Sequence, residues 1–162
     1  MPDEADFIRT IKENEGIIFR ITTVYCADRI DRQDLYQDIV YQLWKSFDSF
    51  NKTAKLSTWL YRVALNTAIT HLHKAKRLGG IVALDDFMLN LADESSQFTQ
   101  ERTIEMYSKI RNLGPVEKSI VLLYLEGKTY AEIADITGFT VTNTATRLSR
   151  IREKLKNQLN NK

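Results

Sequence analysis

The sequence predicts an all-α protein made of two small helical domains joined by a linker, the second domain being a helix-turn-helix. Apolar residues recur at spacings of three and four through most of the 162 residues, as they do on one face of a helix. Glycine is rare, with only six in the chain and none between Gly16 and Gly79. The last fifty residues, Leu113–Lys162, contain three short helical patterns separated by glycines and threonines.

The first two helices are expected at Asp6–Tyr25 and Asp31–Phe47. Gly16 or the β-branched run Ile21–Val24 could interrupt the first of them. The second has one apolar side and one polar side. The polar side consists of Asp34, Gln37, Asp38 and Tyr41, with Lys45 beside them. It is either an ordinary solvated acidic face or a docking face for a basic partner.

A third, long helix is expected after the polar loop Asn51–Lys55, with Ser57 as its cap. Two faces of this helix are apolar, so it must be largely buried among its neighbours. The remaining narrow face holds Trp59, Arg62, Asn66, Ile69, Thr70 and His73. An aromatic ring, an amide and cations beside a basic loop suit unpaired nucleic acid, through base stacking and phosphate contacts. The alternative is that Trp59 is simply part of the core.

The C-terminal unit follows Gly79-Gly80, an acidic connecting stretch and a helix expected at Thr103–Asn112. Its own helices are delimited by residues suited to helix ends: Pro115 and Gly127 for the first, Thr129 and Gly138 for the second, and Thr140 for the start of the third. Two helices joined by a short turn with glycine have the spacing of a helix-turn-helix, whose second helix lies in the DNA major groove.

The last helix, expected to run to about Leu159, has two distinct faces. Its buried stripe is predicted to be Ala145, Leu148, Ile151, Leu155 and Leu159. A rotation of about 100° per residue brings short hydrogen-bonding and basic side chains to the other side. These are Thr142, Asn143, Thr146 and Arg150, with Arg147 beside them. Such side chains suit base edges and phosphates. The alternative is a solvated amphipathic helix with a basic surface.

The net charge of +2 is unevenly distributed along the chain. Residues 51–80 hold six basic and no acidic side chains, and residues 141–162 hold six basic and one acidic. The segments 1–50 and 81–140 are acidic, with net charges of −4 and −5. Two separate basic blocks predict two separate contacts with a polyanion.

Several classes of protein are disfavoured by the composition. The single cysteine, Cys26, cannot form an internal disulfide. His71 and His73 lie two residues apart and so face different directions on a helix, and we expect no metal site, cofactor or catalytic residue. The acidic N-terminus lacks a signal peptide's apolar core, and no apolar run approaches membrane-spanning length. We therefore expect a soluble cytoplasmic protein that does not insert into membranes.

Three stretches occur in a fixed order: DLYQDIVYQLWKSF, then LSTWLYRVALNTAITHLHK after the loop, and a C-terminal helix-turn-helix ending TRLSRIREKL. Together they resemble the extracytoplasmic-function (ECF) sigma factors of bacterial RNA polymerase. The resemblance implies sigma region 2 over residues 1–78, a linker over 79–100 and sigma region 4 over 101–162. It implies a non-enzymatic initiation factor that binds core RNA polymerase and promoter DNA. An anti-sigma factor is a further candidate partner.

The resemblance also implies a role for each polar face. In the family an acidic-Leu-x-Gln-acidic pattern docks on the clamp helices of the polymerase's largest subunit; here this is Asp34, Gln37 and Asp38, with Tyr41 on the same face. The loop and third helix of the family recognise and melt the minus-10 element, which implies Asn51, Lys52, Lys55, Trp59, Arg62, Asn66 and Thr70. The last helix of the family reads the minus-35 element, which implies Thr142, Asn143, Thr146, Arg147, Arg150 and Arg152.

One segment departs from the family pattern. Many members have Thr-Val-Lys-Ser where this chain has Asn143-Thr144-Ala145-Thr146, so one candidate phosphate contact is missing and the base preference cannot be transferred.

The rival hypothesis is a stand-alone helix-turn-helix regulator whose N-terminal part senses a ligand or dimerises. A metal-dependent hydrolase using His71 and His73 lacks both a ligand cluster and a nucleophile.

Overall fold

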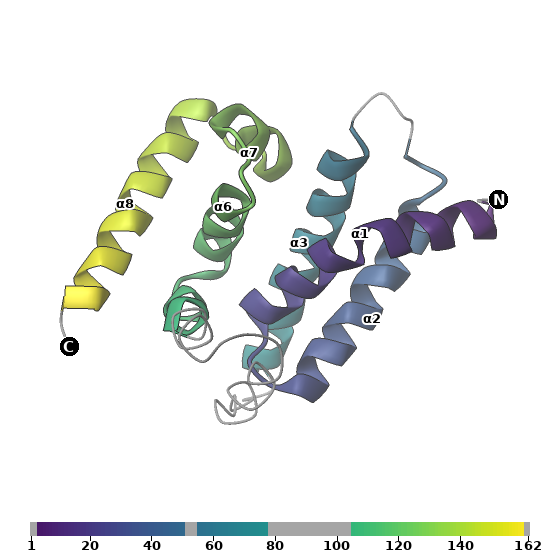
Figure 1. Cartoon of the computed structure of the whole chain (residues 1–162), viewed down its shortest axis with the longest axis horizontal. Coiled ribbons are helices and arrows are strands. Elements are labelled where there is room, and N and C mark those ends of the chain that lie inside the picture. Colours follow the sequence, from purple (N-terminus) through teal and green to yellow (C-terminus); the bar gives the residue numbers. More distant parts are fainter. Residues whose placement is uncertain (1–2, 51–54, 78–104, 161–162) are drawn as a thin grey trace. The chain divides into compact units, whose positions relative to one another are not determined.

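The computed structural model describes residues 3–50, 55–77 and 105–160, and every regular element in these ranges is a helix. The chain divides into two compact units, Met1–Ile81 and Val82–Lys162 (Figure 1). The predicted all-α class with two helical domains is confirmed, while the predicted linker 79–100 lies outside the described residues. No helix in the described part of the chain combines the length and apolar character needed to cross a bilayer.

The first unit is a bundle of three helices, α1 (Glu4–Tyr25), α2 (Arg29–Ser46) and α3 (Leu56–Arg77). Each helix packs against the other two, and α2 and α3 run in opposite directions while α1 crosses them (Figure 1). The core contains the side chains that the helical spacing predicts to face inward, among them Ile18, Ile21, Leu35, Ile39, Leu43, Leu60, Tyr61 and Ala64.

Helix α1 is continuous, so the interruption considered at Gly16 or at Ile21–Val24 does not occur. The β-branched threonines of that run are buried, and both hydroxyls donate to the carbonyl oxygen of Phe19: Thr22 at 2.6 Å and Thr23 at 3.0 Å. Bonding back to the preceding turn satisfies each hydroxyl without leaving the helix. Burial of this end of α1 therefore outweighs the weak helix propensity of its residues.

Helix α3 begins two residues earlier than expected, at Leu56. The amide of Trp59 donates to the carbonyl oxygen of Lys55 at 3.2 Å, so helical hydrogen bonding already starts from Lys55. Ser57 then lies inside the first turn, and the prediction that it caps the helix is wrong. The cap position belongs to the residue whose carbonyl accepts the first helical bond.

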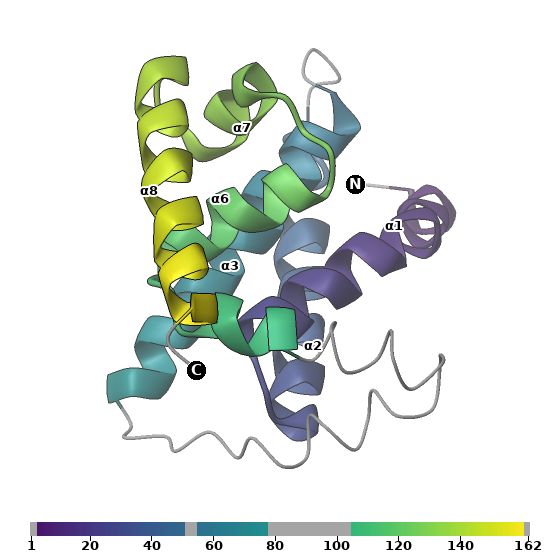
Figure 2. The same ribbon diagram turned by 60° about the vertical axis from the view of Figure 1, so that its left-hand side comes forward.

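In its described residues, the second unit contains a helix over 105–111 followed by α6 (Pro115–Leu125), α7 (Tyr130–Thr137) and α8 (Val141–Asn160). Helix α8 packs against both α6 and α7 (Figure 2). Fully or almost fully buried side chains form the core of this unit: Ile110, Leu113, Ile120, Leu123, Ile133, Leu148 and Ile151. The order and packing of α6, α7 and α8 are those of the predicted helix-turn-helix.

The helix ends in this unit form as the sequence predicts. Gly127 and Gly138 have φ values of 82° and 85°, in the left-handed region where glycine avoids the strain that a Cβ causes. Thr129 and Glu132 form a capping box, in which each side chain accepts the other residue's amide at 3.1 Å. The Thr140 hydroxyl accepts the amide of Asn143 at 3.0 Å at the start of α8.

The buried side of α8 differs from the prediction at two positions. Leu148 and Ile151 are buried as expected, but Ala145 and Leu155 are only half-buried, and Thr144 is fully buried in place of Ala145. The side chain of Leu159 lies outside the described residues. The Thr144 hydroxyl donates to the carbonyl oxygen of Thr140 at 2.9 Å. Because this local bond satisfies the hydroxyl, a polar residue can occupy the centre of the stripe at little cost.

Candidate functional site

One side of α2 presents the predicted polar face to solvent. Asp34, Gln37, Asp38 and Tyr41 are all exposed, whereas Leu35, Ile39 and Leu43 on the other side of the helix are completely buried. Tyr41 is 57% exposed, and the Lys45 ammonium lies 5.5 Å from the centre of its ring. The face therefore offers two carboxylates, an amide and an aromatic ring on a helix whose back is fixed in the core.

Tyr36, on the inner flank of the same helix, does not belong to this face. It is half-buried, and burial raises the pKa of its phenol above the ordinary value of 10.0, with a smaller contribution from the Glu15 carboxylate on α1. The phenol thus remains neutral where α1 and α2 meet.

A groove of about 480 Å³ lies between α2 and α3. Its lining is entirely from these two helices: Asp38, Tyr41, Gln42, Asn66, Thr67, Thr70, His71 and Lys74. Two residues of the predicted polymerase face, Asp38 and Tyr41, therefore share one surface with Asn66 and Thr70 of the predicted minus-10 face. The sequence does not reveal this contact, because it depends on how two antiparallel helices are aligned.

His71 is a residue of this groove whose partners the sequence did not predict. Its Nε2 lies 2.8 Å from Asp31 Oδ1, and its Nδ1 lies 3.5 Å from Asp38 Oδ2. The side chain of His71 is only 17% exposed, so it bridges the two helices from a half-buried position. It sits on the face of α3 that the helical pattern assigns to packing, and no nearby motif identifies its acidic partners.

The predicted minus-10 residues on α3 fall into two groups. Arg62, Asn66 and Thr70 are exposed at intervals of four, so they form one column along the helix. Trp59 is half-buried: its ring lies 5.0 Å from that of Phe50 and 6.0 Å from that of Phe47, between ring centres.

The Trp59 ring is thus one edge of an aromatic cluster that continues to Phe7 and Trp44, whose ring centres are 5.0 Å apart. Phe7 also lies 5.3 Å from Phe47, which joins the two halves of the cluster. The two interpretations of Trp59 are therefore not exclusive, because the ring both packs and keeps an accessible part. Lys55 is exposed, while Asn51 and Lys52 lie outside the described residues.

The exposed side of α8 carries most of the predicted minus-35 residues. Thr142, Asn143, Thr146 and Arg150 are exposed. Arg147 is half-buried and held in place, since its Nε donates to Asn143 Oδ1 at 3.1 Å and its guanidinium lies 4.4 Å from the centre of the Phe139 ring. These contacts fix the direction of two side chains before any ligand binds.

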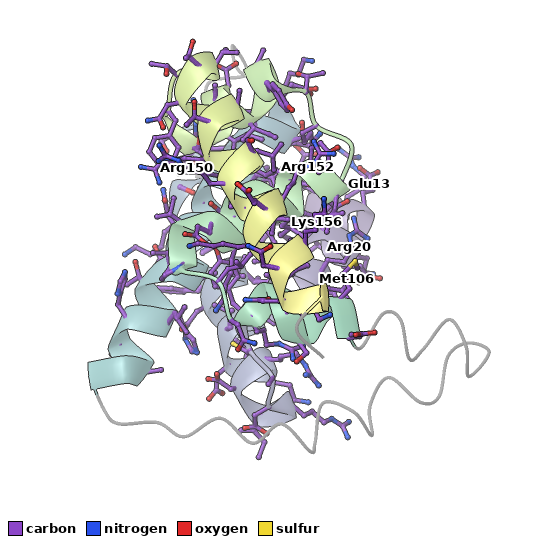
Figure 3. All side chains as sticks on the ribbon, turned by 90° about the vertical axis from the view of Figure 1, so that its left-hand side faces the viewer. Glu13, Arg20, Met106, Arg150, Arg152 and Lys156 are labelled. Carbon is purple, nitrogen blue, oxygen red and sulfur yellow. The ribbon has the colours of Figure 1, made fainter. Side chains whose placement is uncertain are left out.

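Arg152 lies apart from this group. Its guanidinium is 5.4 Å from the centre of the Tyr124 ring on α6. Figure 3 shows Arg150 and Arg152 on opposite sides of α8. The structure therefore brings five of the six predicted residues to one side of the helix and leaves Arg152 on the other.

Comparison with known proteins gives matches over both units. Two family models match the chain, Sigma-70 region 2 over residues 10–78 and Sigma-70, region 4 over residues 104–155. The ECF RNA polymerase sigma factor SigW of Bacillus subtilis is 28% identical over 173 residues, which covers 96% of this chain and 88% of SigW. The ECF RNA polymerase sigma-E factor of Haemophilus influenzae is 28% identical over 169 residues, covering 97% of this chain and 89% of the relative.

Two solved structures share the fold. The sigma factor RpoE in complex with the anti-sigma factor NepR, from Bartonella quintana, has a TM-score of 0.75 at 19% identity, covering 96% of this chain and 98% of RpoE. CnrH in complex with the cytosolic domain of CnrY has a TM-score of 0.63 at 21% identity, covering 98% and 90%. With region 2 and region 4 both matched and relatives aligned over nearly the full length, the chain belongs to the ECF sigma factors, the non-catalytic initiation factors that direct RNA polymerase to promoters.

Proposed function

We propose that this sigma factor divides promoter recognition between residues 1–78, as region 2, and residues 101–162, as region 4. In this proposal α2 docks on the clamp helices of the polymerase's largest subunit, α3 holds the melted minus-10 element, and α8 reads the minus-35 element. The observation that carries it is the groove in which Asp38 and Tyr41 meet Asn66 and Thr70. A shared groove would keep opened DNA beside the polymerase surface to which the sigma factor is attached.

The docking role of α2 is supported by exposure and charge. Asp34 and Asp38 present carboxylates at an interval of four, with Gln37 between them, on a helix that is rigidly backed by the core. Carboxylates fixed in this way suit a basic helical partner, because opposite charges on complementary faces select the partner and speed association. Tyr41 adds an exposed aromatic ring of the kind enriched at protein interfaces.

The minus-10 role of α3 is supported by the column of Arg62, Asn66 and Thr70 and by the accessible edge of Trp59. Opening a duplex costs roughly 1.4 kcal/mol of stacking per step. Stacking one base on an aromatic side chain returns about 1–3 kcal/mol. One domain can therefore trap a captured base but cannot hold a whole bubble, which is why the proposed opening requires the polymerase.

The minus-35 role of α8 is supported by the face that holds Asn143, Thr146 and Arg150. Amide and hydroxyl groups suit base edges, and a flexible exposed arginine suits either a guanine or a phosphate. Arg147, braced by Asn143 and Phe139, is poised at the border of this face. Arg152 is directed elsewhere and is the least favoured member of the predicted set.

The docking assignment is tested by the double variant Asp34→Asn, Asp38→Asn. It should weaken binding to core RNA polymerase about tenfold, the equivalent of about 1.4 kcal/mol, and lower run-off transcription in parallel. Both side chains are exposed, so the variant should fold normally, as measured by circular dichroism. The matched control is Glu13→Gln, an exposed acidic residue on α1. Unchanged polymerase binding would remove the docking face from the proposal and favour a stand-alone regulator.

An anti-sigma factor is a further proposed partner, and the cytoplasm is the proposed place of action. The support is that the similar RpoE structure is a complex with an anti-sigma factor and that CnrH is bound to a cytosolic domain. A partner that covers the polymerase face would have to compete for Asp34 and Asp38. Competition between core polymerase and a candidate anti-sigma factor for the labelled chain tests this point.

A further inference from the structure

Three potential metal ligands from three different elements meet at one end of the first unit. Cys26 follows the last residue of α1, Asp31 lies in the first turn of α2, and His71 lies on α3. One ligand atom of each residue lies within 4.8 Å of the other two. Among the described residues, this is the one group of three potential metal ligands whose ligand atoms lie so close together. We propose that Cys26, Asp31 and His71 form a binding site for a thiophilic divalent metal ion, with Zn²⁺ as the preferred ion.

The donor set decides the class of metal. A thiolate, an imidazole and a carboxylate are ligands of Zn²⁺, and Mg²⁺ and Ca²⁺ prefer oxygen alone. In a tetrahedral zinc site with bonds of about 2.0–2.3 Å, neighbouring ligand atoms are about 3.5 Å apart. A pair of ligand atoms at the 4.8 Å limit would therefore have to close by about 1.3 Å, whereas His71 Nε2 and Asp31 Oδ1, at 2.8 Å, would have to move apart by about 0.7 Å; side-chain rotation can supply both changes. The fourth position would be left for water.

The orientation of His71 fits a metal ligand. Its Nε2 points to Asp31 Oδ1 at 2.8 Å, while its Nδ1 points to Asp38 Oδ2 at 3.5 Å. A metal-ligating histidine normally donates its other ring N–H to a carboxylate, which fixes the tautomer and raises the basicity of the ligand nitrogen. Asp38 would be that outer carboxylate, with Nε2 bound to the metal.

The connection between α1 and α2 holds the other two ligands in position. The amide of Cys26 donates to the Thr22 carbonyl at 2.8 Å, and Arg32 Nη1 donates to the Ala27 carbonyl at 2.8 Å. Asp28 caps α2 and accepts the amide of Asp31 at 3.4 Å. The short segment that carries Cys26 and Asp31 is therefore tied to both helices, as a preorganised site requires.

The burial of the ligands leaves a route for the ion. Cys26 is 2% exposed, the side chains of His71 and Asp31 are 17% and 35% exposed, and that of Asp38 is 60% exposed. The site therefore runs from a buried thiol to carboxylates that reach solvent.

Binding converts the Cys26 thiol to a thiolate and releases one proton, so the affinity for the metal ion should fall as pH is lowered. An occupied site would join α1, α2 and α3 at a single point.

An ordinary interhelical ion pair also explains the contacts of His71, and Cys26 distinguishes the two possibilities. An ion pair needs only His71 and the carboxylates, whereas a zinc site also needs the thiol. Full-length reduced protein, freed of metal by a chelator, is titrated with Zn²⁺ against a chromophoric competitor and separately with Co²⁺. We expect one equivalent to bind with a dissociation constant at or below ~1 µM, and Co²⁺ to give a thiolate-to-metal absorption band.

Four variants locate the site. Cys26→Ala and His71→Gln should each lower the affinity at least tenfold, and Cys26→Ala should abolish the thiolate band. Asp38→Asn should weaken binding about 10–100-fold without changing the stoichiometry. His73→Gln is the matched control, because His73 is exposed and lies two residues further along α3. Cys26→Ser replaces Cys26→Ala if the latter fails to fold, as judged by circular dichroism of the metal-free protein.

The outcomes separate cleanly. One equivalent of Zn²⁺ whose binding depends on Cys26 and His71 but not on His73 supports the site. The proposal is overturned if the wild-type protein shows no saturable binding or no thiolate band. It is equally overturned if Cys26→Ala binds Zn²⁺ as tightly as the wild-type protein does, or if His73→Gln reduces binding as much as His71→Gln does.

Discussion

Replacing Arg150 with alanine should weaken the binding of the assembled holoenzyme to the upstream promoter element and leave the fold of region 4 intact. Arg150 is exposed on α8, on the side opposite the fully buried Leu148. Substituting an exposed residue outside the core changes the free energy of unfolding by no more than about 0.5 kcal/mol. The loss of affinity should therefore report a lost contact with DNA and not a damaged domain.

The expected size follows from counterion release. Each phosphate neutralised by a protein cation contributes about −0.9 to the slope of log affinity against log salt. If Arg150 contacts one phosphate, the variant's slope is shallower by about 0.9, and between 50 and 200 mM salt the wild type loses ~3.5-fold more affinity than the variant does. If Arg150 instead reads a guanine, Arg150→Ala should also relax the preference at that one base pair by about 1–3 kcal/mol.

The assay is fluorescence anisotropy of a labelled duplex that carries only the upstream element, with the sigma factor assembled on core polymerase and the salt varied. The comparison variant is Arg152→Ala, which removes the same charge from the same helix but from the side that faces Tyr124. A slope unchanged by Arg150→Ala would refute the contact. Equal changes from both variants would show that α8 attracts DNA through its overall charge and that the Arg150 side has no special role.

Two further predictions concern region 2 and the turn before α8. Trp59→Ala should spare polymerase binding but reduce promoter opening, measured by permanganate reactivity of the bubble; normal opening in a merely destabilised protein would assign Trp59 to packing with Phe47 and Phe50. Gly138→Ala should cost about 1 kcal/mol of unfolding free energy, because its φ of 85° suits a residue without a Cβ. Thermal unfolding measures that loss of stability, and Ala131→Gly at an exposed position of α7 is the comparison variant. No change in stability on Gly138→Ala would mean that the turn relaxes around the new side chain.

The helical pattern was sufficient to predict the fold class and the two faces of α2, because burial follows directly from a spacing of three and four. It placed Asp34, Gln37, Asp38 and Tyr41 on the exposed side, as the structure has them. Helix ends marked by a single strong local preference were also predictable. The left-handed turn at Gly138 is an example, since few other residues adopt that backbone conformation.

Errors arose where a local bond or a distant neighbour decided the outcome. Thr144 can take the place of Ala145 in the buried stripe because the Thr140 carbonyl satisfies its hydroxyl, and a hydropathy pattern does not include such a bond. Ser57 was favoured as a cap by residue type alone, while backbone bonding begins at Lys55. The contact between His71 and Asp31 joins residues 40 positions apart in the sequence, so only the packing of α2 on α3 reveals it.

In the proposed role of α8 as the reader of the minus-35 element, the separation of its two faces has a consequence for how promoter preference can change during evolution. Thr142, Thr146 and Arg150 are exposed, so substituting them changes the free energy of unfolding little. New base preferences can therefore be sampled one residue at a time. Arg147 is under a different constraint, because it is tied to Asn143 and to the Phe139 ring. Divergent relatives should therefore vary freely at the three exposed positions, while residues 139, 143 and 147 change together or not at all.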